Sequence, residues 1–249
     1  MSTEISFRQR LSKIPFMRMI YDAYLILFKH TYFGGRMATC HSCDFLRDPQ
    51  FMAAITAAVG RNGTVNATYA WNINVACWAA LQASRLDGHF VECGTAKGST
   101  AAAILSYLNW SGDKYFYLFD TFKGLDSNQI TEHDTGARNQ HYPDVYSDVI
   151  EYFGKFKKVV PVRGIVPESL NQIPKSTRVA FLHIDMNCAA PEEAALEFFR
   201  DLFVPGAYIL LDDYGWLAYG PQKAIHNKFA ESLGRKVLPL PTGQGLIIV

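Results

Sequence analysis

The chain has 249 residues, 49% of them hydrophobic, and a formal net charge of +1. This length fits one large domain with an N-terminal extension, and the near-neutral charge argues against a dedicated nucleic-acid-binding protein. The five cysteines are an odd number, which does not indicate a disulfide framework. Cys40 and Cys43 form a C-x-x-C pair, but no second Cys or His pair follows at zinc-site spacing. We therefore interpret them as ordinary thiols rather than as a metal or redox site.

Residues 1–86 are interpreted as a helical N-terminal extension. Residues 1–36 are basic and rich in aromatic side chains. They predict one or two amphipathic helices that pack on the main domain or on a second subunit, and the alternative is a helix lying on a membrane surface. Charged residues interrupt the apolar stretch 14–33 and no secretory signal is found, so we expect a cytoplasmic protein without a transmembrane segment. Two further helices are predicted over 48–59 and 65–86.

From residue 87 onward, strands and helices alternate. Strands are predicted at 89–93, 115–120, 159–163, 179–185 and 207–212, with helices at 99–108, 146–153, 191–202 and 222–233. Near-continuous apolar strands separated by helices predict a parallel sheet covered on both faces. Two last strands, 236–240 and 245–249, are joined by a short connection, which predicts an antiparallel pair. We therefore expect an α/β fold with a doubly wound, mostly parallel, seven-stranded sheet that ends in an antiparallel hairpin.

The first of these strands runs into a glycine turn: residues 89–100 read His-Phe-Val-Glu-Cys-Gly-Thr-Ala-Lys-Gly-Ser-Thr. Strand, glycine turn and helix form the first unit of a nucleotide-binding α/β sheet. The turn lacks the third glycine of the dinucleotide fingerprint and does not match the triphosphate-binding P-loop. Glu92 would repel a pyrophosphate, but it suits S-adenosylmethionine, which has an amino-acid end and no phosphate. The alternative is a turn that binds no ligand.

Other polar residues follow strands at the same edge, where ligands bind in open α/β sheets. Asp120 ends the second predicted strand, 26 residues after Gly94. A carboxylate at this position can accept hydrogen bonds from both hydroxyls of a ribose. Arg163 and Gly164 follow the third strand at the same edge.

Three aspartates, Asp185, Asp212 and Asp213, end two strands that should be neighbours in such a sheet. Three like charges placed close together are costly unless they share a proton or a cation. An all-oxygen ligand set suits Mg²⁺, and a substrate hydroxyl bound to that ion becomes more acidic. The alternatives are that Asp185 acts alone as the catalytic base, or that all three aspartates have a structural role.

A family resemblance rests on six motifs that occur in order: Phe90-Val-Glu-Cys-Gly94, Leu118-Phe-Asp-Thr-Phe-Lys-Gly124, Val162-Arg-Gly-Ile-Val-Pro-Glu-Ser-Leu170, Phe181-Leu-His-Ile-Asp185, Leu210-Leu-Asp-Asp-Tyr-Gly215 and Pro241-Thr-Gly-Gln-Gly245. Over residues 88–249 the chain resembles the macrocin O-methyltransferase (TylF-type) family, which methylates sugar hydroxyls of macrolides and related natural products. The resemblance implies a Rossmann-like class I methyltransferase domain over residues 87–249.

The resemblance also implies S-adenosylmethionine at the glycine turn and at Asp120, with the adenine near Gly164 and Ile165, and Mg²⁺ at Asp185, Asp212 and Asp213. The candidate cofactor-binding residues are Glu92, Gly94, Thr95, Gly98, Ser99, Asp120, Thr121, Gly164 and Ile165. The candidate catalytic residue is Asp185.

The chain departs from the family after Asp185. Where the family often has Asp-x-Asp-x-Tyr, this chain reads Asp-Met-Asn-Cys-Ala. Asn187 can ligate a cation through its amide oxygen but cannot act as a base. Cys188 stands where some members have a catalytic histidine.

Two regions are expected to shape the substrate pocket. The loop at 121–146 is long, polar and punctuated by glycine and proline, as functional lids are. Trp216, Tyr219 and Gln222 follow the aspartate pair, and aromatic side chains beside hydroxyl-binding groups suit a sugar ring.

The predicted function is S-adenosylmethionine-dependent, Mg²⁺-assisted methylation of a hydroxyl of a sugar, a glycosylated natural product or a polysaccharide. The expected partner is this small-molecule or saccharide substrate, and a homo-oligomer is also considered. The alternatives are methylation of a catechol-like phenol, a nicotinamide-dependent oxidoreductase, and a non-catalytic partner protein that keeps the cofactor fold.

Overall fold

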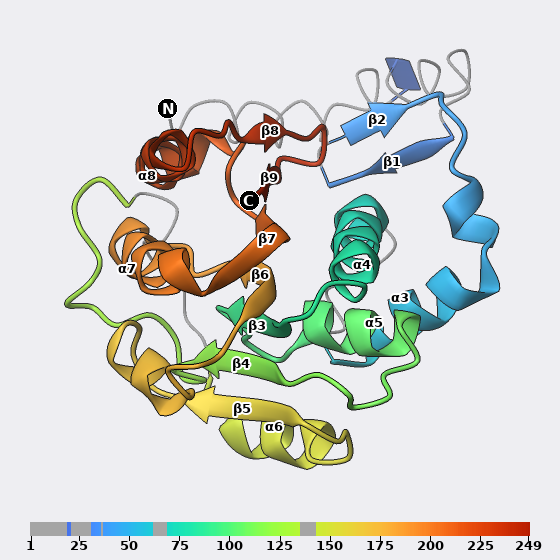
Figure 1. Cartoon of the computed structure of the whole chain (residues 1–249). Coiled ribbons are helices and arrows are strands. Elements are labelled where there is room, and N and C mark those ends of the chain that lie inside the picture. The colour runs from blue at the N-terminus through green and yellow to red at the C-terminus, as the bar shows by residue number, and fades with distance from the viewer. Residues whose placement is uncertain (1–18, 21–30, 36, 62–68, 135–142) are drawn as a thin grey trace.

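A seven-stranded sheet forms the centre of the molecule (Figure 1). The computed structural model describes residues 19–20, 31–35, 37–61, 69–134 and 143–249. The strands lie in the order β5-β4-β3-β6-β7-β9-β8, and only the pairs that include β9 are antiparallel. Their bounds are β3 His89–Cys93, β4 Phe116–Asp120, β5 Val159–Arg163, β6 Val179–Ile184, β7 Phe203–Leu211, β8 Leu238–Pro239 and β9 Gly245–Ile248. The expected doubly wound sheet with a C-terminal hairpin is confirmed.

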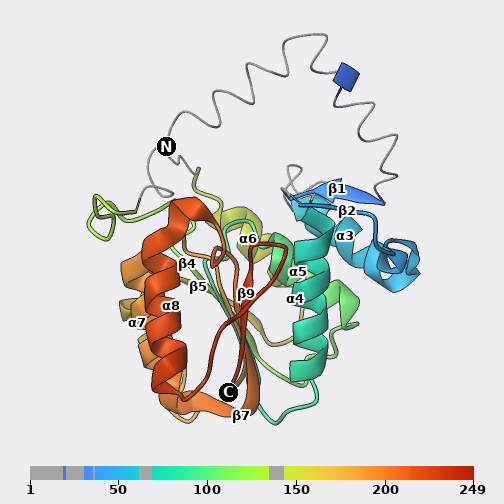
Figure 2. The same cartoon turned by 90° about the horizontal axis from the view of Figure 1, so that it is seen from above.

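Helices cover both faces of this sheet (Figure 2). The α-helices are α3 Pro49–Arg61, α4 Ala70–Ala83, α5 Ser99–Tyr107, α6 Tyr146–Phe153, α7 Ala189–Phe199 and α8 Gly220–Ser232. Short 3₁₀ helices among the described residues are η1 Asp44–Arg47, η3 Glu168–Gln172, η4 Arg200–Leu202 and η5 Leu217–Tyr219. In Figure 2, α7 and α8 lie on one side of the strands and α4 and α5 on the other.

Alternation along the strands explains the two cores. Phe90 of β3 packs with residues of α4, α5 and α6, whereas its neighbour Val91 packs with residues of α7 and α8. Successive strand side chains point to opposite faces, so a strand with helices on both sides needs apolar residues at every position. Both side chains are fully buried, and each burial stabilises the fold by roughly 1.5–3 kcal/mol.

The N-terminal part of the chain adds a third layer. Helix α3 packs on α5, and Phe51 and Ile55 of α3 form a separate core with Ile73 of α4. Upstream, β1 Tyr32–Gly34 and β2 Met37–Thr39 form an antiparallel hairpin. The sequence placed Tyr32–Gly34 in an amphipathic helix, and this is wrong: the chain turns at Gly35, which has a φ of +54° that glycine tolerates.

Most of the basic stretch 1–36 lies outside the described residues, so its packing, membrane contact and role in an oligomer stay predictions. None of the described helices is both long and apolar enough to cross a bilayer.

Some predicted bounds moved. Helix α4 packs directly on β6 and β7, although the boundary at residues 86 and 87 placed it in the extension; that boundary stays a prediction. Strand β7 begins at Phe203, four residues earlier than expected, because Phe203 pairs with Val179 of β6. Strand β4 begins at Phe116 and excludes Tyr115.

Candidate active site

A cavity of about 570 Å³ opens at the carboxyl ends of the parallel strands. Residues at or just beyond the ends of β3, β4, β5 and β6 line it: Gly94, Asp120, Gly164 and Asp185. Ligands bind at this edge in open α/β sheets, and small-molecule pockets typically measure roughly 300–1,000 Å³. The loop after β4 also lines the cavity, through Thr121, Phe122, Gly124, Leu125, Asp126, Gln129, Pro143 and Val145. The described part of this loop therefore lines the cavity, as we expected for a loop that shapes the pocket.

The glycine turn after β3 brings two strand ends into main-chain contact. Gly94 has a φ of +93°, and a Cβ atom there would lie 1.9 Å from the carbonyl oxygen of Asp185. Gly98 has a φ of +79°, and a Cβ atom there would lie 2.4 Å from the ring of Phe153. Only glycine combines these backbone angles with such close approach, so the structure requires both glycines at these positions.

Asp120 combines two roles at the end of β4. One carboxylate oxygen accepts the N–H of Ala96 at 2.7 Å, and the other accepts the N–H of Phe122 at 2.6 Å. Burial raises the pKa of Asp120, and these N–H groups offset the rise only in part. A carboxylate has about four acceptor positions. Asp120 can therefore hold the glycine turn and still accept a ligand hydroxyl from the cavity.

Glu92 is buried and is not among the residues that line the cavity. Its Oε1 lies 2.9 Å from Nδ1 of His183 on β6, and the two residues are directly paired between the strands. The other ring nitrogen, Nε2, lies 3.7 Å from Oδ1 of Asp212. The proposed contact between Glu92 and the donor's amino-acid end stays a prediction, because the described partner of Glu92 is His183.

His183 lies between two carboxylates, those of Glu92 and Asp212. Burial alone would lower the pKa of the ring, but the carboxylates of Asp212 and Glu92 outweigh burial and raise the pKa to about 10. The sequence analysis missed this residue. The available signal was a histidine inside the otherwise apolar stretch Val179–Ile184.

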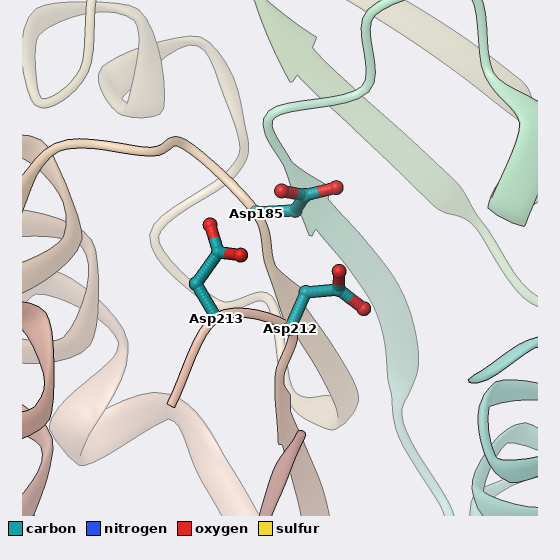
Figure 3. Close-up of side chains that lie close together, drawn as sticks. All are labelled: Asp185, Asp212 and Asp213. Carbon is teal, nitrogen blue, oxygen red and sulfur yellow. The ribbon is translucent and has the colours of Figure 1, made fainter. Parts of the chain in front are cut away.

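The three aspartates meet as the sequence predicted (Figure 3). Asp185 follows β6 and Asp212 and Asp213 follow β7, and each offers one carboxylate oxygen within 4.8 Å of the others. Burial and then the neighbouring carboxylates raise the pKa of Asp213 to about 8, and they raise the pKa of Asp185 well above its usual range. Oδ2 of Asp213 is buried and has no hydrogen-bond partner among the described residues. The cluster therefore holds more acceptors than its surroundings satisfy.

Asp212 is held by the C-terminal hairpin. Nε2 of Gln244 donates to Oδ1 of Asp212 at 2.9 Å, and Oε1 of Gln244 accepts the hydroxyl of Thr242 at 2.9 Å. Gln244 is 1% exposed and also lies against the carbonyl of Asn72 on α4. The motif Pro241-Thr-Gly-Gln-Gly245 thus orients Asp212 through the hydrogen bond from Gln244.

The structure separates some predicted residues from the cavity wall. Gly94, Asp120, Thr121 and Gly164 line it, whereas Thr95, Gly98, Ser99 and Ile165 do not. Asp185 lines the cavity, whereas Asp212 and Asp213 do not.

Asn187 and Cys188, where the chain departs from the family, both form hydrogen bonds with other residues of the protein. Oδ1 of Asn187 accepts the hydroxyl of Tyr219 at 2.6 Å, and Sγ of Cys188 donates to the carbonyl of Gln129 at 3.0 Å. Burial and then Asp134 raise the pKa of the Cys188 thiol to about 12, so it stays neutral. Both residues line the cavity, and Cys188 does not belong to the aspartate cluster.

Trp216, Tyr219 and Gln222, which were expected to shape the substrate pocket, lie in different surroundings. Tyr219 reaches the cavity wall through Asn187. The Trp216 ring packs so closely on Gly243 that a Cβ atom there would meet its Nε1 at 2.7 Å. Gln222 is fully buried and does not line the cavity.

A parallel sheet closed by an antiparallel hairpin, with a glycine turn and acidic strand ends around one cavity, defines a class I, S-adenosylmethionine-dependent methyltransferase. The chain belongs to the macrocin O-methyltransferase (TylF) family, whose model matches residues 72–234. It is accordingly an S-adenosylmethionine-dependent O-methyltransferase.

Solved structures show the same fold. The O-methyltransferase NovP is similar at 16% identity and a TM-score of 0.61, covering 74% of this chain and 81% of that one. The calicheamicin methyltransferase CalS11 is similar at 16% identity and a TM-score of 0.59, covering 84% of this chain and 94% of that one. No curated protein matches the sequence.

Proposed function

We propose that the protein transfers the methyl group of S-adenosylmethionine to a hydroxyl of a sugar, a glycosylated natural product or a polysaccharide, with Mg²⁺ held by Asp185, Asp212 and Asp213. One observation carries the proposal: three carboxylates converge within 4.8 Å, and one of them, Asp185, lines the cavity. CalS11 is described as a TDP-rhamnose 3'-O-methyltransferase, which supports a sugar acceptor for this chain too.

The cluster fits a hard divalent cation. Its donors are all carboxylate oxygens, the ligands that Mg²⁺ prefers. Like charges so close together repel strongly unless a proton or a cation is shared. Burial first, and then this repulsion, raise the pKa values of Asp185 and Asp213. The unpartnered Oδ2 of Asp213 leaves an acceptor for a ligand. When bound, the ion would make an adjacent hydroxyl more acidic.

The donor would lie between the glycine turn and Asp120. Gly94 lets the main chain approach a ligand closely, and Asp120 would accept the ribose hydroxyls. Gly164, at the end of β5, lines the same cavity and suits the adenine. S-adenosylmethionine supplies an electrophilic methyl group, and transfer then depends mainly on in-line positioning.

Asp185 would act on the acceptor. It is the cluster member on the cavity wall, so its carboxylate can take the hydroxyl proton as the oxygen attacks. Asp212 would be held in place, because Gln244 donates to its Oδ1 and Nε2 of His183 lies 3.7 Å from the same oxygen. The acceptor itself would lie under the loop that begins at Thr121.

The test separates the parts of this proposal. Calorimetry should show binding of S-adenosylhomocysteine and no binding of NADH. Methylation should be found with nucleotide sugars or glycosides and should exceed that of catechols in the same panel. EDTA should abolish turnover, and Mg²⁺ should restore it. If turnover is intact in EDTA, the proposed role of Mg²⁺ is wrong. If catechols are methylated in preference to sugars, the proposed sugar acceptor is wrong.

A further inference from the structure

The donor-binding turn between β3 and α5 has an unfavourable backbone. Ala96 has a φ of +48°, in the left-handed region that residues with a Cβ atom disfavour, and it lies between Gly94 and Gly98, which also have positive φ. Such a conformation persists only where neighbouring groups fix it. Ala96 and Lys97 both line the cavity, so the contacts that fix this turn also determine the shape of the donor site.

Some of these contacts come from the sheet itself. Asp120 accepts the N–H of Ala96 at 2.7 Å, and the turn closes on itself where Gly98 donates to the carbonyl of Thr95 at 2.7 Å. Another contact comes from outside the sheet: Nε of Arg61, the last residue of α3, donates to the carbonyl of Lys97 at 2.9 Å.

Arg61 is itself rigidly held. Its side chain is 6% exposed, and its two terminal nitrogens donate to the carboxylate of Asp148 on α6 at 3.3 and 2.5 Å. The guanidinium carbon lies 4.2 Å from the centroid of the Tyr152 ring, a geometry that favours a cation. A guanidinium fixed in this way on both sides can hold the Lys97 carbonyl at one position.

We propose that Arg61 is a positioning residue for the methyl donor, and that helix α3 thereby becomes part of the donor site. The inference rests on the proposed donor site. Arg61 lies outside the cavity lining and acts through the main chain of Lys97. Without it, the carbonyl loses its charged donor, and the turn can relax away from the strained angles at Ala96.

A purely structural role would attach α3 to α6 without affecting the donor. The two roles differ in what each contact serves. The hydrogen bonds to Asp148 join the two helices, whereas the hydrogen bond from Nε reaches the turn. Asp148→Asn removes the negative charge and so weakens the hydrogen bonds that join the two helices. It does not remove the hydrogen bond from Nε of Arg61 to the carbonyl of Lys97. Phe51, which is 1% exposed, belongs to the separate core of α3, and no residue of the turn belongs to that core. Phe51→Leu therefore loosens α3 without removing a contact to the turn.

The experiment compares Arg61→Met, Arg61→Lys, Asp148→Asn and Phe51→Leu with the wild-type full chain. Calorimetry measures the Kd of S-adenosylhomocysteine, thermal unfolding gives Tm, and hydrogen exchange without ligand follows the peptide over residues 94–99. Arg61→Met should raise Kd about tenfold, equal to ~1.4 kcal/mol, and speed exchange of this peptide. Arg61→Lys should give an intermediate Kd.

Asp148→Asn, which loosens one side of the guanidinium, should raise Kd by less than Arg61→Met does. Phe51→Leu should keep Kd within about twofold of the wild type, even where Tm falls as much as in Arg61→Met. The inference is overturned if Arg61→Met leaves both Kd and exchange of residues 94–99 unchanged, or if Phe51→Leu changes them equally. A wild-type chain that binds no S-adenosylhomocysteine would refute the donor site itself, and the exchange of residues 94–99 would then still decide whether Arg61 fixes the turn.

Discussion

The carboxylates at the two halves of the sheet edge are stabilised in different ways. At the β3–β4 half, Asp120 accepts two backbone N–H groups and Glu92 pairs with His183. At the β6–β7 half, Asp185 and Asp213 face other carboxylates, and one oxygen of Asp213 is buried without a partner among the described residues. The first half can orient a ligand with carboxylates that already have hydrogen-bond partners in the protein. The second half needs a proton or a cation, which is the property expected where a substrate hydroxyl is activated.

The largest effect should come from the second half. Asp185→Asn should lower kcat/KM by about 10³-fold, since positioned acid–base catalysis contributes roughly 10²–10⁴-fold. The Kd of S-adenosylhomocysteine should stay within about threefold, because the donor contacts lie elsewhere. Asp201→Asn, an exposed aspartate of η4, is the matched control and should behave as wild type. A loss of donor binding as large as the loss of turnover would erase the distinction between the two halves.

The reverse pattern is expected at the first half. Asp120→Ala removes the acceptor proposed for the ribose and releases the N–H of Ala96. Calorimetry should show a Kd for S-adenosylhomocysteine that is about 30-fold higher, because hydrogen bonds to charged groups contribute roughly 1.5–3 kcal/mol. The rise in Tm produced by Mg²⁺ should persist in this variant. A donor affinity unchanged by the substitution would contradict the placement of the ribose at Asp120.

A smaller loss of activity is expected when the hydrogen bond that orients Asp212, in the second half, is removed. Gln244→Ala removes the donor to Oδ1 of Asp212, and kcat/KM should fall about tenfold, as is typical at the low end for residues that orient metal ligands. The concentration of Mg²⁺ needed for half-maximal activity should rise. Gln172→Ala, at an exposed glutamine of η3, serves as the control. Equal activity of the two variants would show that Gln244 does not orient Asp212.

The aspartate cluster should also make stability depend on pH. Because the pKa of Asp213 is raised to about 8 in the folded protein from 3.8, the folded state holds a proton that the unfolded state releases between these values. The free energy of unfolding therefore falls as pH rises through this window. His183, raised from 6.5 to about 10, acts in the same direction over its own window.

Thermal unfolding in EDTA should accordingly show a Tm several degrees lower at pH 8.5 than at pH 6. Mg²⁺ at pH 8.5 should recover a part of it, since a ligand at 100 times its Kd stabilises by about 2.7 kcal/mol. Asp213→Asn should flatten the pH dependence and remove the response to Mg²⁺. The same slope in wild type and variant would show that Asp213 does not titrate in this range.

The smallest effect is expected at Cys188. Its thiol donates to the carbonyl of Gln129, and burial and then Asp134 raise its pKa to about 12. Cys188→Ala should keep kcat/KM within about twofold at every pH tested between 6 and 9. A loss of more than tenfold would place this thiol in the chemistry and would extend the reactive half of the edge beyond the aspartates.

The sequence allowed much of the fold and part of the site to be predicted, for identifiable reasons. Parallel strands end at one edge, so residues that follow apolar strands converge whatever the details of packing, and Asp185, Asp212 and Asp213 did so. Gly94 could be singled out because close backbone approach demands glycine.

Other features depend on register and tertiary contact. His183 faces Glu92 only because β3 and β6 align at that pair, and no local pattern determines that alignment. Gln244 reaches Asp212 across 32 residues of sequence through the hairpin. The strand Tyr32–Gly34 was predicted as helix because periodicity over so short a segment says little.

The contact between Gly94 and the Asp185 carbonyl has a consequence for how new acceptors could be accommodated. Because a side chain at Gly94 would collide with that oxygen, the turn proposed to bind the donor and the aspartate proposed as the base are in direct main-chain contact. The gap that a methyl group must cross is thereby set by the scaffold rather than by mobile side chains. Changes in the segment that follows Asp120 can reshape the acceptor pocket while this spacing is inherited unchanged, so one frame can serve many different alcohols.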